Sequence, residues 1–158
     1  MKPRILIVYT GGTIGMTEDL ATGALVPFSF DHLVRNVPKI GRLGYALDHV
    51  EIDPPIDSSN MNPAHWAQVA KMIADAYDDF DGFVVLHGTD TMAYTASALS
   101  FMLRGLAKPV ILTGSQLPIG EIREDGTENL ITALQIAAAR TGDGAPMVQE
   151  VAISFGRH

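Results

Sequence analysis

The feature that most constrains this 158-residue chain is a design used three times, in which a short apolar run ends in a turn of glycine and hydroxyl residues. The runs at residues 4–9, 82–86 and 109–112 are rich in β-branched side chains, which is typical of strands buried on both faces. The first run ends in TGGT, the second in HGTDT and the third in TGSQ. The repeated design predicts parallel strands whose turns carry the polar chemistry.

Stretches with a helical pattern separate the apolar runs. The first is well marked at its start, because Asn62 suits the N-cap and Pro63 suits the first helical position. Strands that alternate with helices predict an α/β fold of three layers, α/β/α, with a mainly parallel, Rossmann-like or flavodoxin-like sheet. Helices are expected at residues 63–77, 92–103 and 127–139, and a further strand at residues 151–155.

Two segments are expected to be irregular, at residues 18–30 and residues 46–59. The first mixes Gly23, Pro27 and acidic side chains, which is typical of a mobile loop that covers a site. Neither segment has the composition of a linker between domains. The length of the chain therefore predicts one domain over residues 1–158.

Composition narrows the classes of function. The formal net charge is -7 and the lysines and arginines are scattered, which argues against a nucleic-acid partner. No apolar stretch approaches the length of a membrane span, and the run at residues 5–9 is too short for a signal peptide. The expectation is a cytoplasmic protein with a small-molecule partner and no membrane association.

The three turns should gather at one edge of the sheet, because parallel strands end on the same side. Their spacing matches neither glycine-rich nucleotide motif, so no nucleotide cofactor is expected. The five histidines show no metal-binding spacing, and the chain has no cysteine, so no metal is expected either. His87 is interpreted as a hydrogen-bonded structural group in preference to a general base.

With nucleotide and metal sites set aside, the remaining candidates for catalysis in these turns are the hydroxyl side chains. A threonine is a poor nucleophile unless a neighbouring group takes its proton or main-chain donors stabilise the resulting oxyanion. Thr13 has main-chain amides around it. On spacing alone, however, Thr10, Thr13 and Thr89 are better interpreted as helix caps and turn residues, and both interpretations stay open at this point.

Two of these turns resemble the signature motifs of a known family. TGGTIG at residues 10–15 and HGTDTM at residues 87–92 are similar to the two signatures of bacterial-type L-asparaginases, especially the cytoplasmic type I branch. The resemblance extends over essentially the whole chain. Further similar segments lie at residues 57–61, 93–97, 113–116 and 125–130.

The resemblance implies a threonine mechanism that hydrolyses L-asparagine to L-aspartate and ammonia. Thr13 matches the nucleophile that attacks the amide carbon and forms an acyl-enzyme, while Thr89 and Asp90 match the second catalytic cluster. Asp90 would also bind the substrate ammonium, and Ser58 its α-carboxylate. The resemblance implies a homo-oligomer, a dimer or tetramer, and the expected substrate-binding residues are Gly12, Asp57, Ser58, Ser59, Thr89, Asp90 and Ser115.

The chain departs from the family in two respects. The family's loop tyrosine has no counterpart at residues 23–27, and Tyr9 lies in the preceding strand. The family's catalytic lysine comes just past His158, and Lys108 precedes its strand and so points to the wrong edge. The family's smaller C-terminal domain is absent from these residues. The expectation is the N-terminal domain of an asparaginase with an incomplete site.

Two alternatives remain open. The first is the asparaginase-like component of a tRNA-dependent amidotransferase, which shares these motifs but works beside a large nucleic-acid partner. The second is a non-catalytic domain that binds an amino acid, which would keep Ser58 and Asp90 and need no lysine. Ligand binding without ammonia release would distinguish the second alternative from an enzyme.

Overall fold

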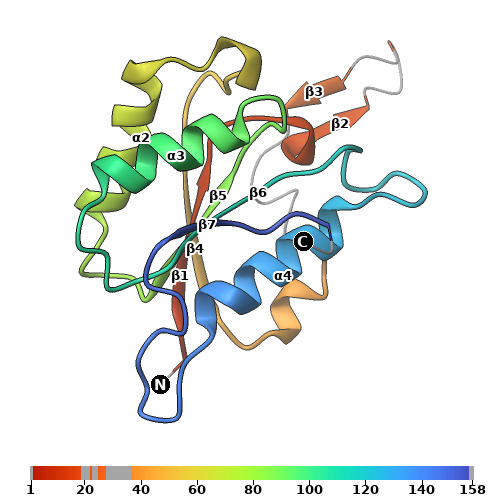
Figure 1. Cartoon of the computed structure of the whole chain (residues 1–158). Coiled ribbons are helices and arrows are strands. Elements are labelled where there is room, and N and C mark those ends of the chain that lie inside the picture. Colours follow the sequence, from red (N-terminus) through yellow and green to blue (C-terminus); the bar gives the residue numbers. More distant parts are fainter. Residues whose placement is uncertain (1, 19–21, 23–24, 28–36, 157–158) are drawn as a thin grey trace.

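A computed structural model describes residues 2–18, 22, 25–27 and 37–156 of the chain. Its centre is a five-stranded parallel sheet, which Figure 1 shows between layers of helices. The predicted α/β class with three layers is therefore confirmed. In spatial order the strands are β4 (Ala46–Glu51), β1 (Arg4–Tyr9), β5 (Gly82–Leu86), β6 (Val110–Thr113) and β7 (Val151–Ile153).

Within the described residues, three α-helices cover the two faces of the sheet. The first two, α2 and α3, pack on one face and α4 packs on the other (Figure 1). Helices α3 and α4 end one residue before their predicted ends, and α2 ends two residues early. The bounds are α2 (Pro63–Asp75), α3 (Met92–Met102) and α4 (Gly126–Ala138).

Among the described residues, the core consists of two hydrophobic clusters separated by the sheet. Successive side chains of a strand point to opposite faces, so Ile5 and Ile7 of β1 join the cluster beneath α4. Leu6 and Val8 join the cluster beneath α2 and α3. The central strands β1, β5 and β6 are thus apolar on both faces, which is why their sequences lack polar alternation.

The predicted start of α2 is confirmed in detail. The side chain of Asn62 accepts hydrogen bonds from the main-chain N–H groups of Ala64, at 3.0 Å, and His65, at 3.3 Å. Pro63 occupies the first helical turn, where its missing N–H needs no partner. This start fixes the direction of α2 as it leaves the loop of residues 52–62.

The expectation of an irregular segment at residues 46–59 is wrong for its first half. Residues Ala46–Glu51 form β4, which pairs in parallel with the whole of β1 from Arg4 to Tyr9. As an edge strand, β4 is only partly buried and contains polar side chains such as Asp48. It therefore lacks the continuous apolar run used to find the other strands.

The other segment expected to be irregular contains a small ribbon. Residues Met16–Glu18 (β2) and Leu25–Pro27 (β3) pair in antiparallel fashion, so the irregular interpretation is wrong for residue 18 and residues 25–27. Most of the predicted covering loop at residues 18–30 lies outside the described residues. The described part of the chain also contains three short 3-10 helices: η1 (Thr13–Gly15), η2 (Ile40–Arg42) and η3 (Ser58–Asn60).

Candidate active site

The turns after β1 and β5 touch each other and the η3 loop through their backbones. Gly12 has a φ of 93°, and a Cβ atom there would lie 2.5 Å from the main-chain nitrogen of Gly88. A Cβ atom on Gly88 would lie 2.5 Å from the Ser58 hydroxyl oxygen. Only glycine allows this approach. The contacts place Thr13 and Thr89 one residue from the point where the two turns meet.

The turn after β6 joins the same edge. The main-chain N–H of His87 donates to the Thr113 carbonyl at 2.9 Å, and a Cβ atom on Gly114 would lie 2.3 Å from the His87 carbonyl oxygen. On the other side, Ile56 N–H donates to the Thr10 carbonyl at 2.8 Å. The three turns and the loop before η3 therefore form one packed edge, as the parallel strands predict.

The hydroxyl groups at this edge fall into two sets. Thr10 donates its hydroxyl to the Leu86 carbonyl at 2.9 Å, and Thr91 donates its hydroxyl to the Ser58 carbonyl at 2.7 Å. In contrast, the hydroxyls of Thr13 and Thr89 have no hydrogen-bond partner in the described part of the chain, and neither residue is fully buried. Thr10 is a structural turn residue, whereas Thr13 and Thr89 keep groups that can meet a ligand.

The main-chain N–H groups of Thr13 and Thr89 are also unengaged. Across residues 2–18, 22, 25–27 and 37–156, no acceptor takes either N–H. Thr13 opens the 3-10 helix η1, where the first N–H groups lack partners within the helix. Main-chain donors without an acceptor at a glycine-rich edge are suited to a negatively charged oxygen.

The η3 segment separates the roles of three predicted residues. Ser58 is only 4% exposed and lies against Gly88, within reach of the turns. The carboxylate of Asp57 accepts from the Ser59 N–H and from the Ser59 hydroxyl, both at 2.9 Å. These bonds, the main-chain one first, lower the pKa of Asp57. Ser58 thus faces the edge, while Asp57 and Ser59 bind each other.

Asp90 and Ser115, the other predicted residues, occupy different surroundings. Asp90 is exposed after Thr89, and its carboxylate makes no ion pair within the described ranges. Ser115 is 3% exposed, and its hydroxyl has no partner among the residues described. Its Cβ lies 3.1 Å from the position that a Cβ on Gly126 would take. Ser115 therefore packs toward the start of α4.

His87 is fully buried at the end of β5 and hydrogen-bonded at both ring nitrogens. Its Nδ1 lies 2.6 Å from the Gly88 carbonyl oxygen, and its Nε2 lies 2.8 Å from the Thr95 hydroxyl. Burial lowers the pKa of His87, although the Gly88 carbonyl opposes the shift. These contacts support the structural interpretation of His87, because no nitrogen is left to act as a base.

Side chains at the start of α4 form hydrogen bonds with the turn after β6. This role was not assigned to them from the sequence. The Asp125 carboxylate accepts from the N–H groups of Gln116 and Leu117, at 3.0 and 3.2 Å. The Asn129 side chain donates to the Gly114 carbonyl at 2.9 Å and accepts from the Gly156 N–H at 3.0 Å. Asn129 therefore ties the turn after β6 to the segment after β7. The signals were an Asp and an Asn four residues apart at a predicted helix start, in a segment that resembles the family.

Tyr9 is a second residue whose role was missed. Its ring lies so close to Gly15 that a Cβ there would be 2.3 Å from the hydroxyl oxygen. The hydroxyl donates to the Gly15 carbonyl at 3.2 Å. Burial, with a smaller contribution from the charge of Glu51, raises the pKa of Tyr9 to about 12. Tyr9 supports the 3-10 turn that begins with Thr13.

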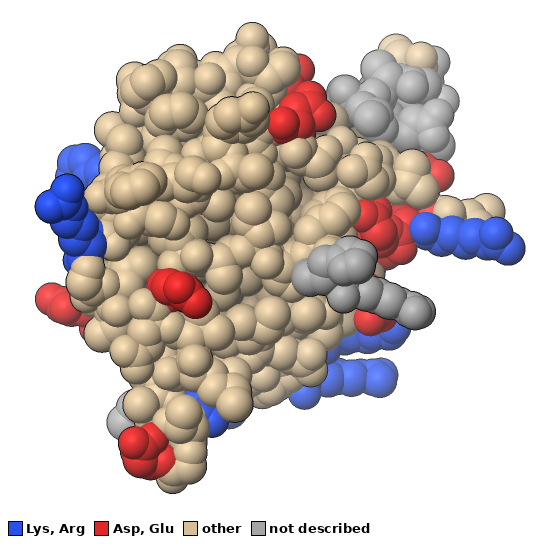
Figure 2. Space-filling view, viewed as in Figure 1, with Lys and Arg blue, Asp and Glu red and all other residues tan. Residues whose placement is uncertain are grey.

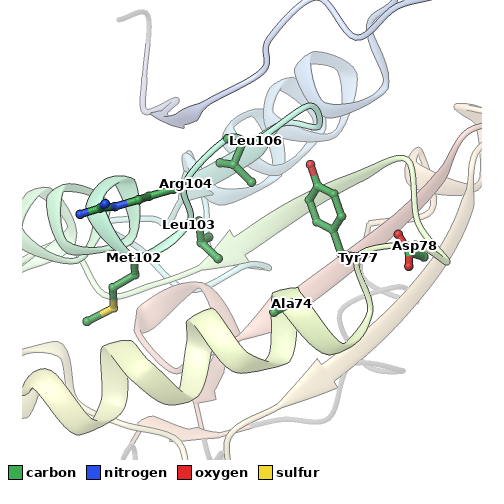
Figure 3. A pocket seen from close by; sticks show the side chains of 8 residues that line it. Ala74, Tyr77, Asp78, Met102, Leu103, Arg104 and Leu106 are labelled. Carbon is green, nitrogen blue, oxygen red and sulfur yellow. The ribbon is translucent and has the colours of Figure 1, made fainter.

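A pocket of about 390 Å³ lies at the opposite edge of the sheet, between the C-terminal ends of α2 and α3 (Figure 3). Tyr77 and Arg104 line it, and the Tyr77 hydroxyl already accepts from the Ala107 N–H at 2.8 Å. The Lys108 ammonium lies 4.7 Å from the centre of the Tyr77 ring. Lys108 is therefore far from the turns, as its place before a strand predicts.

The surface has no feature of a nucleic-acid site in the view of Figure 2, where the Lys and Arg side chains are dispersed and acidic side chains lie among them. Among the described residues, no group of three metal-ligating side chains comes together. In the same part of the chain, no helix is long and apolar enough to cross a membrane. The polar edge formed by the three turns is the candidate site.

Comparisons with known proteins identify the family of the chain. The family model for the N-terminal domain of asparaginase matches residues 4–158. The chain is 51% identical over 141 residues to L-asparaginase 1 of Escherichia coli K12, which covers 87% of the chain and 41% of that protein. It is 41% identical over 143 residues to a component of the glutamyl-tRNA(Gln) amidotransferase of Pyrococcus abyssi, covering 89% and 32% respectively.

A solved structure gives the same result in three dimensions. The crystal structure of L-asparaginase I from Vibrio cholerae O1 superposes with a TM-score of 0.81 at 43% identity, covering 97% of this chain and 44% of that one. The chain belongs to the asparaginase family and contains its N-terminal domain. It spans about two fifths of the length of these asparaginases.

Proposed function

We propose that this domain carries the nucleophilic half of an amidohydrolase site that hydrolyses L-asparagine to L-aspartate and ammonia. The observation that carries the proposal is the contrast among the hydroxyls at the carboxyl edge of the sheet. Thr10 and Thr91 use their hydroxyls to hold the turns, whereas Thr13 and Thr89 do not. Family membership adds support, because Thr13 and Thr89 lie in the two turns that resemble the family's signatures.

In the proposed reaction, the Thr13 oxygen attacks the side-chain amide carbon of asparagine. The carbon–oxygen bond forms, the carbonyl oxygen gains negative charge, and the free N–H groups of the turns would stabilise that charge. The carbon–nitrogen bond then breaks, and ammonia leaves with the proton that Thr13 gave up. Water attacks the resulting ester, releases aspartate and returns the proton to Thr13.

Two side chains would hold the backbone of the amino acid. The exposed carboxylate of Asp90 suits the substrate ammonium, because it has no partner of its own within the described part of the chain. The Ser58 hydroxyl, which lies against Gly88, suits the α-carboxylate. Thr89 would form the second catalytic cluster together with Asp90. Gly12 would keep the first turn packed against Gly88, which holds Thr13 beside the second turn.

A component of an amidotransferase is the second candidate, because some relatives are named as such. Such a protein works beside a nucleic-acid partner and needs a surface that accepts it. The net charge of -7 and the dispersed basic side chains in Figure 2 favour a free amino acid as substrate. The cytoplasmic location and the dimer or tetramer expected from the sequence stay predictions.

The test is ammonia release from L-asparagine and, in parallel, from L-glutamine by the purified chain. Thr13→Ala is expected to lower the rate by at least about 1000-fold, since the attacking atom is removed. Thr10→Ala is the matched control, because it removes a neighbouring hydroxyl that is hydrogen-bonded to Leu86. It should change stability more than rate.

Binding of L-aspartate, measured by calorimetry, separates the remaining outcomes. Aspartate binding without ammonia release would favour the non-catalytic binding domain over the enzyme. Ammonia release that survives in Thr13→Ala would show that another group is the nucleophile. Absence of both binding and release would contradict the proposal that these residues form the substrate site.

A further inference from the structure

A chain of three hydrogen bonds runs through the protein interior to the turn after β5. The indole Nε1–H of Trp66, on α2, donates to the Thr95 hydroxyl at 3.0 Å. The Thr95 hydroxyl, on α3, lies 2.8 Å from His87 Nε2. His87 Nδ1 in turn lies 2.6 Å from the Gly88 carbonyl oxygen. Two helices are thus connected to the peptide that precedes Thr89.

The chemistry of the partners fixes where the protons lie. The Gly88 carbonyl can only accept, so His87 Nδ1 must carry a hydrogen. Burial lowers the pKa of His87, which favours the neutral ring and leaves Nε2 as an acceptor. Thr95 therefore donates its one hydroxyl hydrogen to Nε2 and accepts from Trp66. All donors along the chain point toward Gly88.

The last bond controls the orientation of a peptide that faces the candidate site. The Gly88–Thr89 peptide is planar and trans, so its N–H points away from its carbonyl. His87 holds the carbonyl on the interior side, which leaves the Thr89 N–H on the opposite side. No acceptor in the described ranges takes that N–H.

We infer that Trp66, Thr95 and His87 are positioning residues that orient the Gly88–Thr89 peptide, so that the N–H and hydroxyl of Thr89 face the substrate. The inference rests on the proposed function for the role of Thr89. A purely space-filling side chain at position 87 would pack without this control, and a buried polar chain costs stability unless every member is satisfied. Here every ring nitrogen and the Thr95 hydroxyl are satisfied.

The first test measures the orientation of the Gly88–Thr89 peptide in the absence of substrate. Nitrogen-15 NMR distinguishes the two neutral tautomers of histidine, and the wild-type His87 is expected to carry its hydrogen on Nδ1. Thr95→Val removes the donor to Nε2, and the Thr89 amide resonance should then shift or split. Thr95→Ser keeps the hydroxyl and should restore the wild-type spectrum. Ser100→Ala, which removes a hydroxyl bonded only to Ala96 on the same helix, is the control.

The second test uses turnover of L-asparagine. Thr95→Val is expected to lower kcat by about 10- to 100-fold with KM changed less than about 3-fold, because a misaligned donor affects the transition state most. Thr95→Ser should recover the rate. Trp66→Phe, which removes only the first donor of the chain, is the milder second variant and should give a smaller loss of kcat.

The two tests separate this inference from the proposed function. A wild-type chain that neither binds L-aspartate nor releases ammonia would contradict the proposed function, while the Thr89 amide would still report the orientation of the peptide. An unchanged Thr89 amide in folded Thr95→Val and Trp66→Phe would overturn the inference. A Thr95→Val variant with lower stability but normal kcat would overturn it as well, because the role would then be structural only.

Discussion

The turns after β1 and β5 resemble each other in sequence but are held by different means. In the first, Gly11 and Gly12 adopt φ values of 134° and 93°, which let the backbone approach Ile56 and Gly88 closely. In the second, the buried ring of His87 holds the backbone through a hydrogen bond to the Gly88 carbonyl. The conformation of the turn after β1 thus depends on close backbone packing that only glycine allows. The conformation of the turn after β5 depends on hydrogen bonds to a buried side chain.

This difference predicts different responses to substitution. A side chain added to a glycine of the first turn would overlap backbone atoms of the neighbouring segment. That overlap can be relieved only if the backbone itself moves. A hydrogen-bond chain can lose one member and leave the fold in place, at the cost of a less defined orientation. Lesions in the first turn should therefore act on stability and activity together, whereas lesions in the second should act mainly on activity.

The largest expected effect is that of Gly12→Ala. The new Cβ would lie 2.5 Å from Gly88 N at a φ of 93°, so the strain and the clash together should lower the free energy of unfolding by about 2–4 kcal/mol. Urea denaturation would measure this. Gly41→Ala is the control, since nothing lies within 4 Å of a Cβ there. Equal free energies of unfolding for the two variants would contradict the claim that the turn after β1 depends on close backbone packing.

The second prediction concerns the support behind the first turn. Burial raises the pKa of Tyr9 to about 12, whereas an unfolded tyrosine keeps its ordinary value of 10.0. The unfolded chain thus loses this proton first as pH rises. The stability that neutral Tyr9 contributes is fully present below pH 10 and is lost between pH 10 and pH 12, by roughly 2–3 kcal/mol.

Tyr9→Phe tests this sign directly. At pH 8 the variant should be less stable than wild type by about 1 kcal/mol, because the bond to the Gly15 carbonyl is lost. Near pH 12 the order should reverse, since phenylalanine does not ionise. Tyr94→Phe, at a side chain that is 68% exposed, is the control. Parallel stability curves for wild type and Tyr9→Phe would contradict the prediction.

The smallest effect compares two buried threonines at strand ends. Thr10 is hydrogen-bonded to the Leu86 carbonyl, whereas the Thr113 hydroxyl has no partner among the described residues. Thr10→Val should lower the free energy of unfolding by about 1 kcal/mol, and Thr113→Val should raise it by up to about 1 kcal/mol. Thermal and urea denaturation would measure both. Changes of the same sign would show that the hydrogen-bond pattern does not control these positions.

The sequence predicted most of the fold for a physical reason that the edge strand illustrates. The strands buried on both faces were found because they must be apolar throughout, and α2 was found because Asn62 and Pro63 mark its start. Strand β4 was missed because its outer position tolerates polar residues such as Asp48. Edge strands have a weaker hydrophobic pattern in the sequence, so they are recognised only when their pairing with a neighbouring strand is known.

The candidate site was predicted in part. That the turns share an edge followed from parallel strands, and the resemblance to a family singled out Thr13 and Thr89. The supporting residues were not assigned: Tyr9 and Asn129 look like ordinary strand and helix residues until their partners, Gly15 and Gly114, are known. The placement of Ser115 toward Gly126 was likewise visible only in the fold.

By itself the sequence located three buried strands and the glycine-rich turns that follow them, because burial and glycine backbone geometry are local requirements. Only the tertiary structure decided which hydroxyls are engaged and which are free. The bond from Trp66 to Thr95 joins residues 29 positions apart, and the bond from Thr95 to His87 joins residues 8 apart. Such partners are chosen by how helices pack on the sheet, which no local pattern encodes.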